Sequence, residues 1–202
     1  DITDFAKAKN GRILLLGNSH ADSIKNAFCH VSVSEGYKTY FLVPNNPLMK
    51  GSNVSVEDII NESKDKKLDH IVIHYSQSAL PYNTIKKLVQ NSFENDIRIS
   101  FIMPVPTYNY HVPKALYQEY KYGTPIVKKT KKQYIQDTDN LRNFLSTINL
   151  RNLRVYEVYD YLNGKDGVCL IAEDGYPLYF DSVHLTLTGS RLLKKLLTSI
   201  TL

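Results

Sequence analysis

Residues 12–20 read RILLLGNSH, and this stretch decides how the chain is expected to fold. The run from Ile13 to Leu16 is apolar and ends at Gly17, a pattern typical of a buried parallel strand. The apolar residues that follow have helical spacing: Ala21, Ile24, Ala27, Phe28 and Val31. Ser19 is therefore predicted at a strand-to-helix turn. In that position its hydroxyl is exposed at the carboxyl end of a sheet, and the N–H groups of the helix start point toward it.

Strand and helix patterns alternate along the whole chain. The predicted strands cover residues 12–17, 39–43, 70–75, 97–102 and 153–158. The predicted helices cover about 20–31, 56–66, 83–93 and 191–200. This alternation implies right-handed crossovers and a five-stranded parallel sheet with helices on both faces. The predicted fold class is therefore α/β, and ligands are expected beyond the carboxyl ends of the strands.

A long insertion, about 104–150, separates the fourth and fifth predicted strands. Its second half, about 130–148, has apolar residues at helical spacing. Tyrosines are frequent in its first half: Tyr108, Tyr110, Tyr117, Tyr120 and Tyr122. Exposed tyrosines can stack their flat apolar faces on sugar rings, whereas buried tyrosines would pack the insertion onto the sheet. For any single tyrosine we favour packing, and sugar stacking stays open.

The composition is that of one ordinary globular domain. The chain has 202 residues, of which 43% are hydrophobic and 22% are charged. It contains no apolar run near the roughly 20 residues that span a membrane, and no signal peptide is visible. The net charge is +5. We interpret the densest basic run, 128–132, as a solvated helix start, with a patch for an anionic glycan, lipid head groups or nucleic acid as the alternative.

Two further observations limit the kind of partner and scaffold. No groove-reading or stacking motif accompanies the positive charge, so nucleic acid is not expected as a partner. The only cysteines are Cys29 and Cys169, too few for a disulfide-built scaffold or a zinc ribbon. They are interpreted either as a disulfide formed in an oxidising compartment or as two unpaired buried thiols.

The stretch 181–184, DSVH, supplies the groups that a reactive serine needs. A serine hydroxyl is a weak nucleophile at neutral pH, so it requires a base for its proton and an oriented partner for that base. His184 is the candidate base. Asp181 precedes it by three residues, so on a turn the two side chains can meet and Asp181 can fix the imidazole tautomer. The order serine, aspartate, histidine predicts a Ser19-His184-Asp181 triad.

Each of these elements also has a plainer interpretation. Ser19 alone can be a helix N-cap, and an Asp-x-x-His pair can be a surface hydrogen bond. His20 is adjacent to the candidate nucleophile, but on a turn it is expected to point away. The joint pattern is the reason to prefer catalysis, and the structural context is the required confirmation.

Two blocks of sequence resemble a known family. Residues 17–21, GNSHA, and 179–186, YFDSVHLT, resemble the first and last blocks of the SGNH hydrolases, also called the GDSL family. Further features are similar to one branch, the SGNH domain fused behind acyltransferase-3 membrane proteins: 175–181, Cys169, Gly189, PVP at 104–106 and HVP at 111–113. The resemblance implies a flavodoxin-like three-layer α/β/α fold, no metal, and a serine esterase or acyltransferase mechanism.

The resemblance also implies a function and a location. The fused branch O-acetylates bacterial surface polysaccharides such as lipopolysaccharide O-antigen, so a polysaccharide or lipid-linked glycan is the implied acceptor. Residues 1–202 are then expected to form a single domain of a larger membrane acyltransferase, periplasmic and tethered to the inner membrane. An N-terminal acyltransferase-3 domain would deliver an acetyl group derived from acetyl-CoA, and no cofactor is expected in this domain. The alternatives are a free-standing carbohydrate acetylesterase and a non-catalytic glycan-binding domain with the same fold.

The chain departs from the family pattern where donors to an oxyanion are expected. Asn18 stands where the first block usually has aspartate. After the third strand the chain reads HYSQS at 74–78, in place of a Gly-x-Asn-Asp block whose asparagine donates to the oxyanion. The second-block glycine is also displaced, because Gly36 precedes the second strand and Asn45 and Asn46 occupy the expected loop. Beside the backbone N–H of Ser19, the candidates for oxyanion or substrate contacts are Asn18, Asn45, Ser76 and Gln77.

Overall fold

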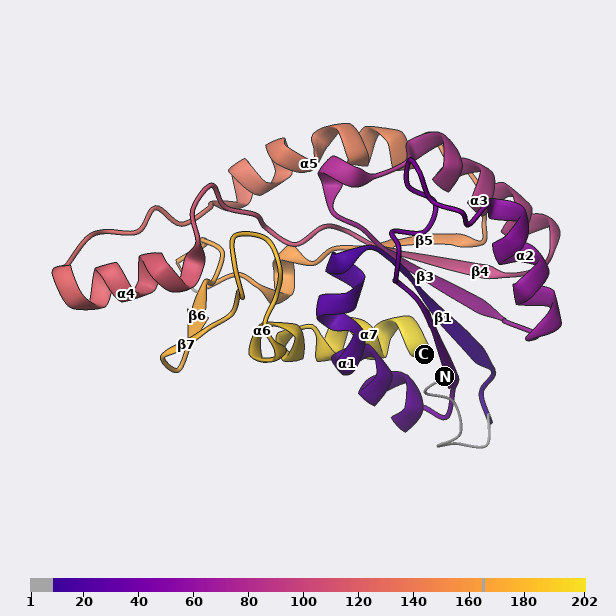
Figure 1. The fold of residues 1–202 in the computed structure, drawn as a ribbon, viewed down its shortest axis with the longest axis horizontal. Helices are drawn as coiled ribbons and strands as arrows, with labels where there is room; N and C mark the ends of the chain where they lie inside the picture. The colour runs from indigo at the N-terminus through magenta and orange to yellow at the C-terminus, as the bar shows by residue number, and fades with distance from the viewer. Residues whose placement is uncertain (1–8, 165) are drawn as a thin grey trace.

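The computed structural model describes residues 9–164 and 166–202, which form the three layers seen in Figure 1. The middle layer is a five-stranded sheet in the order β2-β1-β3-β4-β5. Its strands are β1 (Arg12–Gly17), β2 (Lys38–Leu42), β3 (His70–His74), β4 (Arg98–Ile102) and β5 (Leu153–Tyr156). Every neighbouring pair is parallel. The predicted α/β class with a five-stranded parallel sheet is therefore confirmed.

Helices cover both faces of this sheet (Figure 1). On one face lie α1 (Ser19–Ser34), α6 (Leu187–Leu192) and α7 (Lys194–Thr201). On the other face lie α2 (Val56–Asp65), α3 (Tyr82–Glu94) and α5 (Lys131–Ser146). Tyr82 of α3 stacks on Phe144 of α5 with ring centroids 4.5 Å apart. Capping boxes fix the starts of α2 and α5. In each box the N-cap hydroxyl oxygen accepts a hydrogen bond from the backbone N–H of the third helical residue, and the side chain of that residue accepts one from the backbone N–H of the N-cap.

The two central strands are apolar because helices cover both of their faces. Ile13 to Leu16 of β1 are between 0% and 6% exposed, and every residue of β3 is buried. The strand order places β1 beside β3, with Gly17 opposite His74. The chain winds outward in opposite directions from this pair. The carboxyl ends of β1 and β3 therefore form the switch point at which open parallel sheets bind ligands.

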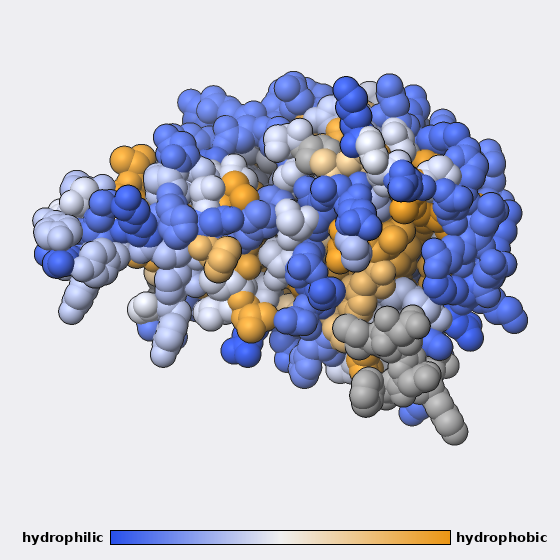
Figure 2. Space-filling model, in the orientation of Figure 1, coloured by the Kyte–Doolittle hydropathy of each residue, from blue (hydrophilic) through white to orange (hydrophobic). Residues whose placement is uncertain are grey.

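β2 is an edge strand and is less completely covered. Figure 2 shows a strip of hydrophobic residues over β2, where Tyr40, Phe41 and Leu42 are half-buried. Lys38 and Lys66 place their ammonium groups 5.7 and 5.3 Å from the centroid of the Tyr40 ring. Lysines along an edge strand oppose its pairing with a strand of another molecule.

The insertion contributes α5 and a shorter helix, α4 (Val112–Tyr122), which lies at the far end of the molecule in Figure 1. Next to α4 is a hairpin of β6 (Ala172–Glu173) and β7 (Tyr176–Pro177). Single 3₁₀ turns lie at Gln77–Ala79 and Tyr159–Tyr161. Helix α4 ends at Gly123, which has a left-handed backbone with φ +67°.

The tyrosines of the insertion divide into two groups. Tyr108 packs edge-on against Tyr179 with ring centroids 5.3 Å apart, and Tyr110 donates its hydroxyl proton to the carbonyl oxygen of Val127. Three tyrosines at or near the end of α4 are instead exposed: Tyr117, Tyr120 and Tyr122. The first two tyrosines are half-buried and hold the insertion to neighbouring segments, whereas the other three are open to solvent.

Several predicted boundaries were wrong. β5 ends at Tyr156 rather than at residue 158, because the chain turns there and buries Val158 ahead of a 3₁₀ turn. The closing helix, predicted at 191–200, is the two helices α6 and α7. It begins earlier than predicted because Thr186 is the N-cap, and its hydroxyl accepts a hydrogen bond from Gly189 N–H. Helix α4 was not predicted, and Val112 is the one residue of this helix that is buried. The other predicted boundaries agree with the structure to within three residues.

The structure also tests the expectations for the two cysteines, the basic run 128–132 and membrane-spanning segments. Cys29 and Cys169 are both free thiols, so the disulfide interpretation is not supported. The basic run 128–132 leads into α5 with Thr130 as the N-cap, which agrees with a helix start. Over the described ranges, no helix is both long enough and apolar enough to cross a bilayer.

Candidate active site

Ser19 begins α1 directly after β1, as predicted. A Cβ on Gly17 would lie 1.9 Å from the carbonyl oxygen of His74 and 2.6 Å from the Cβ of Ala21. Glycine is therefore required for β1, β3 and α1 to approach so closely at this turn. Asn18 caps the helix with its side-chain oxygen, and Ser19 remains exposed at the carboxyl end of the sheet.

The loop 181–184 brings an acid and a base to Ser19. Nδ1 of His184 lies 2.7 Å from Oδ2 of Asp181, and Nε2 of His184 lies 2.7 Å from Oγ of Ser19. Oδ1 of Asp181 accepts from the backbone N–H groups of Val183 and His184 at 2.7 and 2.8 Å. Because the carboxylate accepts the proton on Nδ1, Nε2 is left as the acceptor for the serine hydroxyl. The structure thus joins the three predicted residues in one hydrogen-bonded chain.

Asp181 is held in its ionised form. Partial burial opposes ionisation, but the hydrogen bonds from the His184 ring and from two backbone N–H groups outweigh it and lower the pKa of Asp181 to about 2. A carboxylate at this position stabilises the imidazolium that forms when His184 takes a proton.

Short backbone contacts fix the loop that carries His184. Phe180 N–H donates to the carbonyl oxygen of His184 at 2.8 Å, and Thr186 N–H donates to that of Leu178 at 2.9 Å. A Cβ on Gly189 would lie 2.1 Å from the same Leu178 oxygen, so glycine lets α6 pack directly on this loop. The backbone contacts before and after His184 therefore fix the position of its side chain.

His20 does not point away from the site, and that expectation was wrong. Its side chain is turned inward from α1 and is 3% exposed, with ring centroids 4.9 Å from His184 and 6.2 Å from His74. Burial, with contributions from His74 and His184, lowers the pKa of His20 to about 3. Burial also lowers the pKa of His74 to about 4. Both rings are neutral near pH 7 and place no positive charge against a protonated His184.

Asn18 joins the turn after β1 to the loop after β3. Its Oδ1 accepts from the backbone N–H groups of His20 and Ser76 at 3.1 and 3.3 Å, and its Nδ2 donates to Oγ of Ser76 at 2.9 Å. Because the Ser76 oxygen accepts this bond, its own proton is free to be donated elsewhere. Ser76 lines the same cavity as Ser19, so this proton is available to an oxyanion formed there.

The other oxyanion candidates differ in position. Gln77 lines the cavity, but its Nε2 already donates to the backbone carbonyl of Asp137. Asn45 is exposed in the loop after β2 with φ +60°, and it is not among the residues that line the cavity. The structure therefore brings Asn18, Ser76 and Gln77 to the site and does not bring Asn45. The backbone N–H of Ser19, at the first position of α1, has no partner within the helix.

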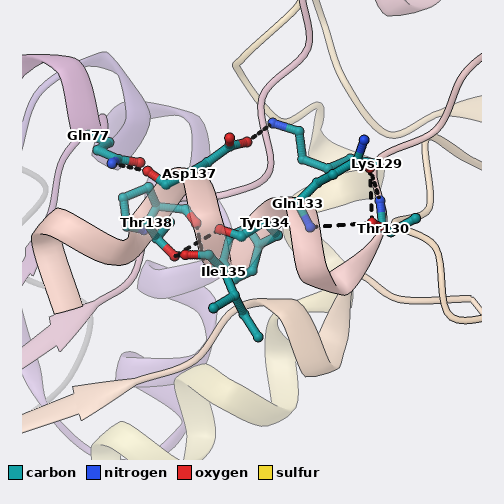
Figure 3. A network of polar contacts seen from close by, with 9 residues as sticks. Gln77, Lys129, Thr130, Gln133, Tyr134, Ile135, Asp137 and Thr138 are labelled. Carbon is teal, nitrogen blue, oxygen red and sulfur yellow. Dashed lines mark hydrogen bonds and ion pairs between the residues drawn. The ribbon is translucent and has the colours of Figure 1, made fainter.

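A cavity of about 630 Å³ opens beside Ser19, and we call it the Ser19 cavity. Figure 3 shows the side of this cavity that is formed by α5 and by Lys129, the residue before the N-cap of α5. Lys129 reaches the carboxylate of Asp137, and the Asp137 carbonyl accepts from Gln77. Tyr134 belongs to the same wall and is buried. Sequence reasoning did not assign Lys129, Tyr134 or Asp137 to the site, because no motif in the insertion indicates which of its residues lie beside Ser19.

The fold and this geometry define a class of protein, a three-layer α/β domain with serine, histidine and aspartate hydrogen-bonded at the switch point of its sheet. The chain belongs to the family of SGNH domains fused to AT3 domains, whose family model matches residues 3–199. The family suggested by the sequence blocks is confirmed. No curated protein matches the chain.

One solved structure shares this fold. The chain is similar to the periplasmic domain of a lipopolysaccharide acetyltransferase from Salmonella ser. Paratyphi A, with a TM-score of 0.71 and 20% identity over 94% of this chain and 82% of that chain. Likeness at this identity confirms the SGNH fold. A weaker likeness, with a TM-score of 0.44 and 10% identity, covers 93% of this chain and 50% of the N-terminal part of a Bacteroides fragilis protein containing a phosphatase domain.

Proposed function

We propose that this domain transfers acetyl groups to a hydroxyl of a bacterial surface polysaccharide, such as lipopolysaccharide O-antigen, through an acetyl-Ser19 intermediate. One observation carries the proposal: both side-chain hydrogen bonds in the chain from Asp181 through His184 to Ser19 measure 2.7 Å. Membership of a family fused to AT3 domains supports acyl transfer as the reaction. The likeness to a lipopolysaccharide acetyltransferase periplasmic domain supports a surface glycan as the acceptor.

In the first half of the reaction Ser19 is acetylated. Nε2 of His184 takes the hydroxyl proton while Oγ of Ser19 forms a bond to the carbonyl carbon of the donor. The bond between that carbon and the donor's leaving group then breaks, and His184 returns the proton to the leaving group. Asp181 keeps the imidazole oriented and stabilises its charged form throughout.

The tetrahedral intermediate places a negative charge on the carbonyl oxygen. The backbone N–H of Ser19 and the hydroxyl of Ser76 are the donors we assign to it, because the first has no helical partner and the second has a free proton. Donors fixed before the reaction are worth about a hundredfold to a thousandfold each in rate. Asn18 acts through Ser76 and is a positioning residue.

In the second half the acceptor hydroxyl replaces the leaving group. His184 takes the proton of a sugar hydroxyl, whose oxygen attacks the acetyl carbon on Ser19. The ester bond to Ser19 breaks, and Oγ recovers the proton from His184. The product is an O-acetylated glycan and a free Ser19, so no cofactor bound to this domain is required.

The family also supports a cellular arrangement. A domain fused to AT3 membrane domains would work on the periplasmic side, tethered to the inner membrane. The membrane domain would present an acetyl group derived from acetyl-CoA to the Ser19 cavity. The acceptor would be a polysaccharide or a lipid-linked glycan that reaches the same cavity from the periplasm.

A second candidate function is a carbohydrate acetylesterase. The exposure of Ser19 favours it, because water that reaches the acetyl-enzyme competes with the sugar hydroxyl. The same residues serve both reactions, and only the acceptor differs.

The test uses a chromogenic acetate ester as donor and the surface polysaccharide of the encoding strain as acceptor. We expect the protein to release the chromophore and to transfer acetyl groups to the polysaccharide, detected by NMR, and Ser19→Ala to do neither. Chromophore release without acetylated glycan would establish the esterase instead. Equal release by both proteins would mean that Ser19 is not the nucleophile, and a non-catalytic glycan-binding domain would replace both proposals.

A further inference from the structure

A second cavity of about 660 Å³ lies along the insertion, and we call it the insertion cavity. Thr107, Lys129 and Asp137 line both this cavity and the Ser19 cavity. The ion pair between Lys129 and Asp137, seen in Figure 3, therefore stands at the junction of the two. Each volume lies within the roughly 300–1,000 Å³ usual for small-ligand sites, so the two adjoining cavities together have room for several sugar rings.

The lining of the insertion cavity suits a carbohydrate. The rings of Tyr108 and Tyr110 lie side by side with centroids 5.2 Å apart, and tyrosine rings present flat apolar faces on which sugars stack. Asn109 and Gln118, both exposed, add amide donors and acceptors of the kind that bond sugar hydroxyls.

The insertion cavity is also attached to the loop that carries the candidate acid. Tyr108 N–H donates to the carbonyl oxygen of Ser182 at 2.9 Å, and Val112 N–H donates to that of Asp181 at 3.1 Å. The Tyr108 ring packs on Tyr179, which lies two residues before Asp181. An occupant of the insertion cavity is therefore held in a fixed position relative to the reacting groups.

We infer that the insertion cavity binds the stretch of acceptor glycan next to the sugar whose hydroxyl enters the Ser19 cavity. The inference rests on the proposed acetyl transfer and adds to it: the acceptor is an oligosaccharide recognised beyond the acetylated unit, with Tyr110 and Gln118 as specificity residues. The two cavities adjoin through three shared lining residues, and an acceptor glycan is a molecule long enough to extend from one into the other.

The test measures binding without turnover. Surface polysaccharide of the encoding strain is hydrolysed and fractionated into one-repeat and three-repeat fragments, and their affinities for the Ser19→Ala protein are measured by calorimetry. Tyr110→Ala in that background is expected to weaken binding of the longer fragment about tenfold, the value of one stacked ring, and to change the shorter fragment much less. Tyr120→Ala is the matched control, since Tyr120 is 91% exposed and does not line the cavity.

Gln118→Ala keeps the test decisive if Tyr110→Ala unfolds, because loss of Tyr110 also removes its bond to Val127. Gln118→Ala is expected to lower the ratio of the affinity for the three-repeat fragment to that for the one-repeat fragment, which we call the length preference, by a smaller factor than Tyr110→Ala. A length preference unchanged in both variants, or lowered equally by Tyr120→Ala, would overturn the inference. Because binding is measured with Ser19→Ala, the result does not depend on whether Ser19 is the nucleophile.

Discussion

Asn18→Asp would restore the residue that the family usually has in its first block, yet we expect it to lower the activity of this protein. In the structure, Nδ2 of Asn18 donates to Oγ of Ser76 at 2.9 Å, which leaves the serine proton free. A carboxylate at the same position has no proton to donate, so the Ser76 hydroxyl must donate to it. The change therefore turns the assigned oxyanion donor away from the cavity.

The expected loss follows from the value of one such donor. Removal of a preorganised oxyanion donor costs about a hundredfold to a thousandfold in kcat, or roughly 2.7–4 kcal/mol. Stability should change little, because aspartate and asparagine are comparable N-caps and a negative charge is favoured at a helix start. The two backbone N–H groups that now bond Oδ1 of Asn18 keep an acceptor.

The assay is hydrolysis of a chromogenic acetate by Asn18→Asp, Ser76→Ala and the double variant. It is followed across pH, because the added charge lies next to Ser19 and also favours protonated His184. If both single changes remove the same donor, the double variant is no slower than Ser76→Ala. An Asn18→Asp protein as active as the parent, or losses that multiply in the double variant, would refute the reasoning.

Three further predictions concern Asp181 and Gly17. Asp181→Asn should lower kcat roughly a thousandfold to ten-thousandfold, because an amide no longer selects the required His184 tautomer, and steady-state hydrolysis measures it. The folded-state pKa of Asp181 is depressed to about 2, so its ionisation stabilises the fold above its ordinary pKa and this contribution is lost as pH falls toward 2. Urea unfolding should therefore show a difference between parent and Asp181→Asn that is constant above about pH 5 and shrinks below pH 4. Gly17→Ala should destabilise by about 3 kcal/mol or more, visible as a lower Tm, because its Cβ would meet the His74 carbonyl oxygen at 1.9 Å.

The parts of the fold and site that could be predicted are those fixed by nearby residues. The apolar run into Gly17 made β1 and the turn at Ser19 predictable, because a buried strand and an amphipathic helix have different periods. Asp181 and His184 were predictable as a pair, because three residues on a turn bring their side chains together. The family blocks then indicated that this pair belongs with Ser19, although 165 residues separate Ser19 from His184.

The remaining features depend on contacts between distant segments. Asn18 and Ser76 are 58 residues apart, and their bond follows from the pairing of β1 with β3 rather than from either local sequence. Lys129 was interpreted as part of a solvated helix start and Asp137 was given no role, because their place at the cavity depends on how α5 crosses the sheet. The direction of the His20 side chain was predicted wrongly, because the residue at which α1 begins determines that this side chain points inward.

The most direct test of the central claim is labelling with a serine-directed phosphonate, followed by mass spectrometry of the intact protein and its peptides. We predict one adduct, located on Ser19, no adduct in Ser19→Ala, and much slower labelling in His184→Ala. An unlabelled parent protein, or labelling that is equal in the parent and in Ser19→Ala, would contradict the assignment of Ser19 as the nucleophile.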